Sequence, residues 1–298
     1  MGRTLASGHW KDQRVNSSLQ EIESQKRFGF GKNWGRFLRV LNNERIEEAE
    51  RSLREMLEID DLTGKSFLDV GSGSGLFSLA ARRLGARVHS FDFDPQSVAC
   101  TAELKRRYFP DDPEWRVDRA SALDENYLKT IGTFDVVYSW GVLHHTGAMW
   151  QALENVEIAV EPRGRLYLAI YNDQRHWSVV WKQIKKLYNT LPVLLRIPYA
   201  ACMIAAMQLK TAARSLLMLQ PQRYIRSWTQ YHKTRGMSHW YDMIDWIGGY
   251  PFEVAAPEEI FDFYRSKGFL LLKLKTCAGG KGCNEFVFQR AGAPSERS

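Results

Sequence analysis

Between positions 66 and 92, short runs of consecutive apolar residues flank a segment in which apolar residues have helical spacing. Phe67, Leu68 and Val70 form the short apolar run of a buried parallel strand. Residues 76–84 then place apolar side chains three and four positions apart, which predicts a helix, and residues 87–92 are predicted as the next strand. This part of the chain is therefore expected to fold as strand, turn, helix and strand.

The chain before this segment is predicted to be mainly helical. Apolar side chains from Ile46 to Leu57 follow helical spacing, so we expect a helix that packs against the sheet edge. Residues 28–34 combine aromatic residues with glycines, and they either cover a ligand as a lid or, as favoured, pack on the core. The predicted parts are an N-terminal helical extension (1–60), the core (61–172), a basic helical insertion (173–256), the C-terminal part of the core (257–290) and a tail (291–298).

Three glycines follow the first strand. Gly71, Gly73 and Gly75 permit a sharp turn and the close approach of a ligand to the backbone. Dinucleotide-binding proteins have another glycine where this chain has Leu76, and Asp69 would repel a pyrophosphate. Asp69 could instead accept hydrogen bonds from an ammonium group or from amides of the loop. The turn therefore favours a cationic ligand without phosphate.

A second carboxylate ends the next strand. Asp92 lies 17 residues after Gly75, at the position from which a carboxylate binds both hydroxyls of a ribose. A nucleoside joined to an amino acid would satisfy both Asp92 and Asp69. This combination indicates S-adenosylmethionine.

Four motifs then carry a resemblance: LDVGSGSG at 68–75, FDFDP at 91–95, FDVVYSWGVLHHT at 134–146 and EPRGRLYLAI at 161–170. Together with residues 257–290, they resemble the core of the class I S-adenosylmethionine-dependent methyltransferases, in particular small-molecule enzymes of the quinone O-methyltransferase type. The resemblance implies an α/β fold with a doubly wound, Rossmann-like, mostly parallel sheet. It also implies an antiparallel last strand, an N-terminal helical extension and a helical insertion after strand 5.

The resemblance further implies which residues bind the cofactor, S-adenosyl-L-methionine. Where the family often has Gly-Asp for the adenine amino group, this chain has Ala120-Ser121. The backbone amides of Ser121 and Ala122, or the Ser121 hydroxyl, would contact adenine instead. The expected cofactor-binding residues are Asp69, Gly71, Ser72, Gly73, Gly75, Asp92, Phe93, Ser121, Ala122 and Trp140.

Candidate catalytic residues follow the later strands, because ligands of open α/β sheets bind beyond the carboxyl ends of the parallel strands. His144 and His145 are adjacent imidazoles there, and either could take a proton from an acceptor. His145 is the preferred base, with capping of backbone groups as the alternative. Tyr171 and Asn172 could orient the acceptor, although core packing is favoured for Tyr171.

No metal is expected. No carboxylate follows the fourth strand, where metal-dependent catechol enzymes would need Asp or Glu. Cys277 and Cys283 flank a glycine loop, but two thiolates alone make a poor metal site.

The composition of the chain also indicates a cellular location. A chain of 298 residues with 44% apolar residues can bury a full α/β core. Its four cysteines include no C-x-x-C pair and are too few for a disulfide framework, which indicates a reducing compartment. Residues 1–24 lack the apolar segment of a secretory signal. We therefore expect a cytoplasmic protein, with a peripheral membrane contact as an alternative.

The formal net charge of +7 is unevenly distributed. Residues 174–236 contain eleven Lys or Arg and no Asp or Glu, so the rest of the chain is net negative. Within this block, residues 177–188 are predicted to form an amphipathic helix. Lys182, Lys185 and Lys186 lie off its apolar face, which holds Trp177, Val180, Trp181, Ile184, Leu187 and Tyr188. The uncharged run 197–209 has thirteen residues, fewer than the ~20 that span a bilayer.

Three interpretations of the insertion stay open. It caps the acceptor pocket, which is favoured, or it rests on an anionic membrane, or it binds nucleic acid. Nucleic acid is disfavoured because the basic residues interleave with Leu, Met and Ala. Four aromatic residues near its end would form either an apolar wall for the acceptor or part of the core: Trp240, Trp246, Tyr250 and Phe252.

Two classes of function result. The first is an S-adenosylmethionine-dependent methyltransferase that acts in line on a small, apolar or aromatic acceptor. Oxygen is the favoured nucleophile, with sulfur and nitrogen as alternatives. The second is a cofactor-binding protein that has lost catalysis and serves as a partner subunit.

Overall fold

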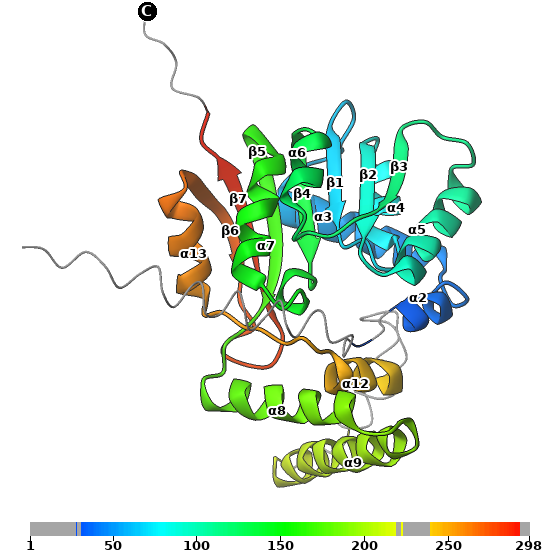
Figure 1. The fold of residues 1–298 in the computed structure, drawn as a ribbon, viewed down its shortest axis with the longest axis vertical. Helices are drawn as coiled ribbons and strands as arrows, with labels where there is room; N and C mark the ends of the chain where they lie inside the picture. The colour runs from blue at the N-terminus through cyan, green and yellow to red at the C-terminus, as the bar shows by residue number, and fades with distance from the viewer. Residues whose placement is uncertain (1–27, 29–30, 219–221, 223–238, 293–298) are drawn as a thin grey trace, which may run out of the picture.

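The computed structural model describes residues 28, 31–218, 222 and 239–292, which form a seven-stranded sheet with helices on both faces (Figure 1). The strands are β1 (Ser66–Val70), β2 (Arg87–Asp92), β3 (Trp115–Arg119), β4 (Phe134–Trp140), β5 (Val160–Tyr171), β6 (Phe269–Lys275) and β7 (Cys283–Arg290). Their order in the sheet is β3-β2-β1-β4-β5-β7-β6. Strands β1 to β5 are parallel, whereas β7 runs antiparallel to both of its neighbours. The predicted Rossmann-like α/β fold with an antiparallel last strand is confirmed.

Helices α6 (Glu125–Thr130), α7 (Met149–Val156) and α13 (Pro257–Ser266) cover one face of this sheet. Tyr264 of α13 is fully buried in this layer, and its hydroxyl donates to the carbonyl oxygen of Leu153 at 2.9 Å. Burial of the phenol is therefore compensated by a hydrogen bond. The opposite face carries α2 (Gly31–Phe37), α3 (Asn43–Leu57), α4 (Leu76–Arg83) and α5 (Pro95–Tyr108).

Helix α3 is the helix expected before the first strand. Asn42 caps it by accepting a hydrogen bond from the Arg45 N–H at 3.1 Å, and Ile46, Leu53 and Leu57 are buried as the spacing predicts. These side chains join a cluster that contains Tyr167 of β5. The helix therefore packs on the face of the sheet and not, as expected, against its edge, because its apolar stripe is wide enough to cover the central strands.

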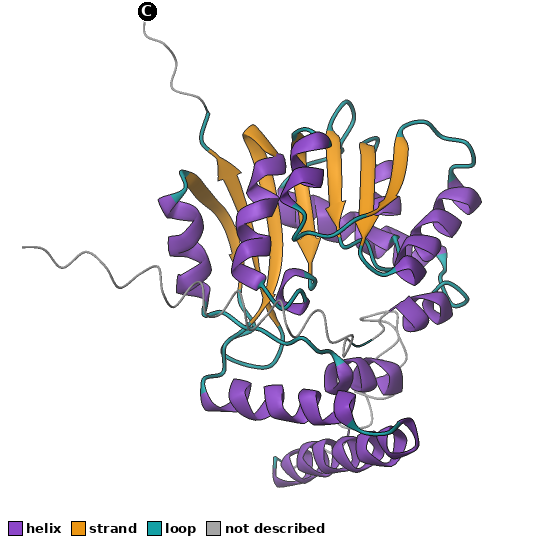
Figure 2. Cartoon of the chain, viewed as in Figure 1, coloured by secondary structure: helices purple, strands orange, loops and turns teal. Residues whose placement is uncertain are grey.

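The insertion after β5 lies beyond the carboxyl ends of the parallel strands, below the sheet in the view of Figures 1 and 2. It contains α8 (His176–Thr190), α9 (Val193–Leu217) and α12 (His239–Gly248). This is the end of an open α/β sheet at which ligands bind, so the insertion stands next to the expected site.

The buried face of α8 agrees with the prediction only in part. Trp181 is buried as predicted, but Trp177 and Leu187 are exposed, and Lys185 is buried although it was expected off the apolar face. The Lys185 ammonium donates to the Trp246 carbonyl oxygen and lies 4.5 Å from the centre of the Trp246 ring and 4.7 Å from that of Phe252. A carbonyl and two aromatic faces compensate the buried charge, so the helix is rotated from the orientation that apolar spacing alone predicts.

Helix α9 is longer than the sequence pattern indicated. It has 25 residues, and within the described part of the chain it is the one helix that is long and apolar enough to cross a membrane. The expectation that the apolar run is too short to span a bilayer is therefore wrong. The uncharged run and the residues on either side of it form one continuous helix, because the flanking Leu, Lys, Ala and Arg residues are all good helix formers.

Candidate active site

The glycine-rich turn joins β1 to α4. Gly71, Gly73 and Gly75 all have positive φ, at 79°, 56° and 80°. A Cβ on Gly71 would lie 2.3 Å from Cγ1 of Val142, so only glycine fits there. Gly71 and Gly73 line a large cavity, whereas Gly75 shapes the turn behind it and packs against Thr101.

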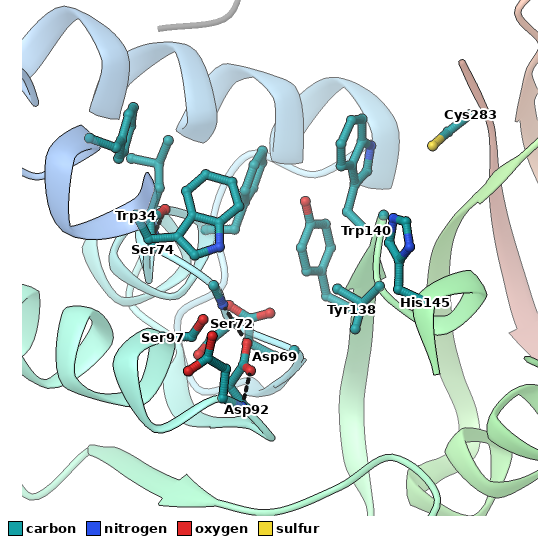
Figure 3. A pocket seen from close by; sticks show the side chains of 18 of the residues that line it. Trp34, Asp69, Ser72, Ser74, Asp92, Ser97, Tyr138, Trp140, His145 and Cys283 are labelled. Atoms are coloured by element: carbon teal, nitrogen blue, oxygen red, sulfur yellow. Dashed lines mark hydrogen bonds between the residues drawn. The ribbon is translucent and has the colours of Figure 1, made fainter. Parts of the chain in front are cut away.

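Asp92 is hydrogen-bonded to this turn. One carboxylate oxygen accepts from the Gly73 N–H at 2.9 Å, and the other accepts from the Asp94 N–H at 2.8 Å. Burial raises the pKa of Asp92 to about 6 in spite of these bonds. Asp92 lines the cavity, as predicted, and Figure 3 shows it next to Asp69 beneath the turn.

Asp69 is buried behind the turn. Its carboxylate accepts a hydrogen bond from the Ser78 hydroxyl at the start of α4. Burial, together with the nearby charge of Asp92, raises the pKa of Asp69 to about 7. A ligand that brings an ammonium group and hydroxyl donors would favour the ionised form of both acids. The two carboxylates therefore fit the amino acid and ribose parts of the predicted cofactor.

The remaining expected cofactor residues line the same cavity and lie at or just after the carboxyl ends of β1 to β4: Ser72, Phe93, Ser121, Ala122 and Trp140. The Ser121 hydroxyl oxygen already accepts from the Leu123 N–H at 3.1 Å, so it holds the turn after β3. The role of this segment toward adenine stays a prediction.

An aromatic covering lies over the turn. Trp34 of α2 packs over Gly73, where a Cβ would be 3.2 Å from its indole ring, and Phe28 donates its N–H to the Tyr250 carbonyl at 3.0 Å. Both aromatic residues line the cavity (Figure 3 shows Trp34). Asp94 fixes this covering by accepting from the Gly31 N–H at 3.0 Å. The sequence analysis missed Asp94, whose only signal was its place after Asp92 in the FDFDP motif.

His145 follows β4 and lines the cavity. Its Nδ1 donates a hydrogen bond to the Pro251 carbonyl oxygen at 2.6 Å, because a carbonyl only accepts. This bond assigns the tautomer in which Nε2 is the basic nitrogen. The arrangement suits the predicted role of His145 as a general base.

His144 has a different environment. It is fully buried, does not line the cavity, and its Nδ1 accepts from the Tyr171 N–H at 3.3 Å. Burial, with His145 and Lys185 nearby, holds the pKa of His144 well below its usual range. His144 therefore stays neutral and positions the end of β5, which argues against it as the base.

Tyr171 and Asn172 also differ in whether they reach the cavity. The Tyr171 ring stacks on His144 with centroids 3.9 Å apart, and one of its faces lines the cavity. Asn172 is buried, and its amide pairs with Asn284 at 3.0 Å and with the Gly280 carbonyl at 3.3 Å. Asn172 thus holds the β6–β7 loop and does not orient an acceptor, contrary to expectation.

The expected aromatic wall is partly present. Trp246 and Tyr250 line the cavity, and Phe252 is buried behind them. The side chain of Trp240 lies outside the described residues.

Sequence analysis missed a polar floor at this end of the cavity, formed by Tyr138, Tyr167 and Glu285. The Tyr167 hydroxyl donates to a Glu285 carboxylate oxygen at 2.5 Å, and Lys275 lies 3.5 Å from the other oxygen. The Tyr138 hydroxyl is buried and has no hydrogen-bond partner among the described residues; Figure 3 shows it pointing into the cavity. The one sequence signal was an acid directly before the apolar run 286–288 of the last strand.

The cavity that the lining residues share has a volume of about 1260 Å³ and extends from the turn after β1 to α12 and β7. Within the described part of the chain, no group of three or more His, Cys, Asp or Glu residues could hold a metal ion. Cys277 and Cys283 line the cavity and are not joined in a disulfide. The metal-free reaction stays a prediction.

Comparison with known proteins finds similarity to several methyltransferases. Residues 68–166 match a model described as a methyltransferase domain. The chain is 29% identical over 177 residues to the mitochondrial ubiquinone biosynthesis O-methyltransferase of Schizosaccharomyces pombe, covering 56% of this chain and 61% of that protein. It is 37% identical over 110 residues to the tRNA U34 carboxymethyltransferase of Ectopseudomonas mendocina, covering 36% of this chain and 33% of that protein. The chain therefore spans less than two thirds of these curated relatives.

A solved structure extends the likeness to the whole fold. The magnesium protoporphyrin IX methyltransferase of Synechocystis, with bound SAH, superposes with a TM-score of 0.51 over 87% of this chain and 95% of that chain. The sequences are 12% identical, so this similarity concerns the fold alone.

Proposed function

We propose that the chain is a class I S-adenosylmethionine-dependent methyltransferase that methylates a small, apolar or aromatic acceptor on oxygen. The observation that carries this proposal is the single cavity that joins Asp92 to His145 and to the aromatic wall. Methyl transfer needs donor and acceptor in line within one space that excludes water, and little other chemistry.

The donor end of the cavity supplies binding and orientation. Asp92 would accept hydrogen bonds from the ribose hydroxyls, and the Asp69 side of the turn would face the ammonium group of S-adenosylmethionine. The bound cofactor would supply a methyl group on a positively charged sulfur. Trp34 covers the turn and keeps water from this end.

The acceptor end supplies the base. His145, oriented by the Pro251 carbonyl, would take the proton of an acceptor hydroxyl at Nε2. Trp246, Tyr250 and Tyr171 would contact the apolar body of the acceptor. Glu285 and the Tyr138 hydroxyl would bind a polar group on its far side, which favours a molecule with a polar edge and an apolar body.

The experiment incubates the purified chain with S-adenosylmethionine labelled in its methyl group and with separate panels of phenols, thiols and amines. We expect labelled product from phenols, and less or none from thiols and amines. Calorimetry with S-adenosylhomocysteine measures binding independently of turnover. Binding without product from any panel would instead assign the chain to cofactor-binding partner subunits.

We further propose that the protein works in the cytoplasm, where its cysteines stay reduced. Besides the acceptor, its proposed partner is an anionic membrane that contacts the basic insertion, and not nucleic acid. Fractionation of cells that produce the tagged chain tests this location, because the protein should divide between cytosol and membranes and be released from membranes by salt.

A further inference from the structure

Helix α9 is apolar on both of its sides although it lies on the surface. Its inner side buries Ala200 and Ile204 against α8 and α12. The outer side presents large side chains that are between 68% and 88% exposed, namely Leu194, Ile197, Leu209 and Leu216. The other exposed residues described between Leu194 and Leu216 are Leu195, Pro198, Cys202, Ala205, Ala206, Thr211 and Ala213. A large exposed apolar face is normally covered, so this outer side needs a partner.

Helix α8, which contacts α9 through the Tyr199 hydroxyl, also exposes apolar side chains and adds charge. Trp177 and Val179 are 58% and 59% exposed, and Leu187 is also exposed. Lys182 and Lys186 are exposed as well. The sequences of both helices contain no Asp or Glu. The two neighbouring helices therefore expose apolar and cationic side chains and no acid.

We propose that this surface docks on an anionic lipid bilayer, with α9 lying in the plane of the membrane interface. The surface is called the α8–α9 face, and its residues are Trp177, Val179, Lys182, Lys186, Leu187, Leu194, Ile197, Leu209 and Leu216. Apolar side chains would enter the boundary of the acyl region, and the lysines would meet lipid phosphates. The positive charge of this face favours an anionic bilayer over a second copy of the chain. A second copy would bring lysines against lysines, whereas anionic lipid neutralises them.

Hydrogen bonds fix α9 lengthwise against its neighbours. The Tyr199 hydroxyl donates to the Ile184 carbonyl of α8 at 3.3 Å, and the Gln208 amide lies 3.1 Å from the Met243 sulfur of α12. Arg196 donates to the carbonyls of Leu191 and Asn189, at 2.9 Å each. A membrane-spanning orientation would break these contacts. The helix therefore lies on the membrane instead of crossing it, despite its sufficient length.

The inner side of α9 links this face to the cavity. Met207 of α9, with Met243 and Trp246 of α12, lines the cavity directly behind the α8–α9 face. The insertion thus caps the cavity with one side and binds lipid with the other. The interpretation as a cap and the interpretation as a membrane contact are therefore compatible. An apolar acceptor dissolved in the bilayer would reach the cavity beside α9. This last step rests on the proposed function, whereas lipid docking does not.

The test is flotation of the full chain with phosphatidylcholine vesicles that contain or lack phosphatidylglycerol. We expect binding to the anionic vesicles, several-fold weaker at high salt. The variant Leu194→Ser/Ile197→Ser/Leu209→Ser should lower the partition coefficient by at least about tenfold, since three large apolar side chains no longer enter the interface. Lys182→Glu/Lys186→Glu should lower binding at low salt and remove most of its salt dependence.

The control variant is Leu270→Ser/Leu274→Ser on β6, which removes two exposed leucines outside the α8–α9 face. It should bind vesicles as the unchanged chain does, and all variants should bind S-adenosylhomocysteine equally, which shows that they are folded. Equal flotation of the triple and control variants would overturn the proposal. So would light scattering that shows a dimer which the triple variant dissociates, without any vesicle binding, because a second copy would then cover the face.

Discussion

The two ends of the cavity are built in opposite ways. The donor end consists of the turn 71–73 and two acids, Asp69 and Asp92, on adjacent strands. The acceptor end is assembled over long distances, since His145 is bonded to Pro251, 106 residues away, and Tyr167 to Glu285, 118 residues away. One end depends on backbone conformation and the other on the packing of distant segments. Donor chemistry is therefore encoded locally, whereas acceptor choice depends on the whole fold.

The largest effect should come from the proposed base at the acceptor end. His145→Ala should lower kcat by about 10²-fold, because it removes the proposed base, while the Kd for S-adenosylhomocysteine stays nearly unchanged. Single-turnover kinetics with the best phenol of the panel measures the first quantity, and calorimetry measures the second.

The matched control is His176→Ala, which changes an exposed histidine at the start of α8. It should leave both quantities unchanged. A full turnover rate in His145→Ala would mean that the acceptor reacts without a base, and the acceptor end would then serve for positioning only.

The donor end gives the next effect. Asp92→Ala should weaken cofactor binding by roughly 1.5–3 kcal/mol, or about ten- to a hundredfold in Kd, because it removes charged hydrogen bonds to the ribose. Glu114→Ala changes an exposed acid before β3 and serves as the control in the same titration. An unchanged Kd for Asp92→Ala would place the ribose elsewhere.

The same end predicts a pH dependence. In the ligand-free fold, burial raises the pKa of Asp69 to about 7 and that of Asp92 to about 6, above their usual value of 3.8. The folded protein therefore holds protons that the unfolded chain has released. This contribution to the free energy of unfolding is complete below about pH 4 and is lost as the pH rises through the two folded pKa values.

Cofactor binding should show the reverse trend, because it uses the ionised carboxylates. The Kd for S-adenosylhomocysteine should rise by up to about tenfold per pH unit between about pH 7 and pH 6, where Asp69 is protonated, and by up to about a hundredfold per unit well below pH 6, where both acids are. It should become constant above about pH 8. Calorimetry across this range measures it, and Asp69→Asn should flatten the upper part of the profile. A flat profile for the unchanged chain would show that both acids are already ionised without ligand.

Sequence reasoning succeeded where the determinants are local. The turn after β1 needs positive φ at successive glycines, and the alternation of strand and helix follows from spacing, so the fold and the donor end could be predicted. It failed where a distant partner changes the environment of a residue. Lys185 is buried because Trp246 and Phe252 surround its ammonium group, and Asn172 is used by Asn284. No spacing within α8 or β5 could reveal either contact.

The smallest expected effects come from two Tyr→Phe substitutions, which distinguish a role of the Tyr138 hydroxyl in acceptor binding from a role in stability. Tyr138 and Tyr264 both bury a phenol, but only Tyr264 has a hydrogen-bond partner among the described residues, the Leu153 carbonyl at 2.9 Å. Removing a buried hydroxyl without a partner relieves a desolvation penalty, whereas removing a bonded one leaves the carbonyl unsatisfied. Tyr138→Phe should therefore raise the free energy of unfolding by about 1 kcal/mol, and Tyr264→Phe should lower it by a similar amount.

Urea denaturation of the ligand-free proteins measures both changes with the same substitution at two sites. If the Tyr138 hydroxyl binds the acceptor, Tyr138→Phe should also raise KM for the acceptor by about threefold, since the variant gains stability at the expense of one hydrogen bond to the ligand. Tyr264→Phe should leave KM unchanged, because its ring lies on the opposite face of the sheet. Destabilisation by both substitutions would mean that Tyr138 already has a partner in solution, and the floor of the acceptor end would then be structural.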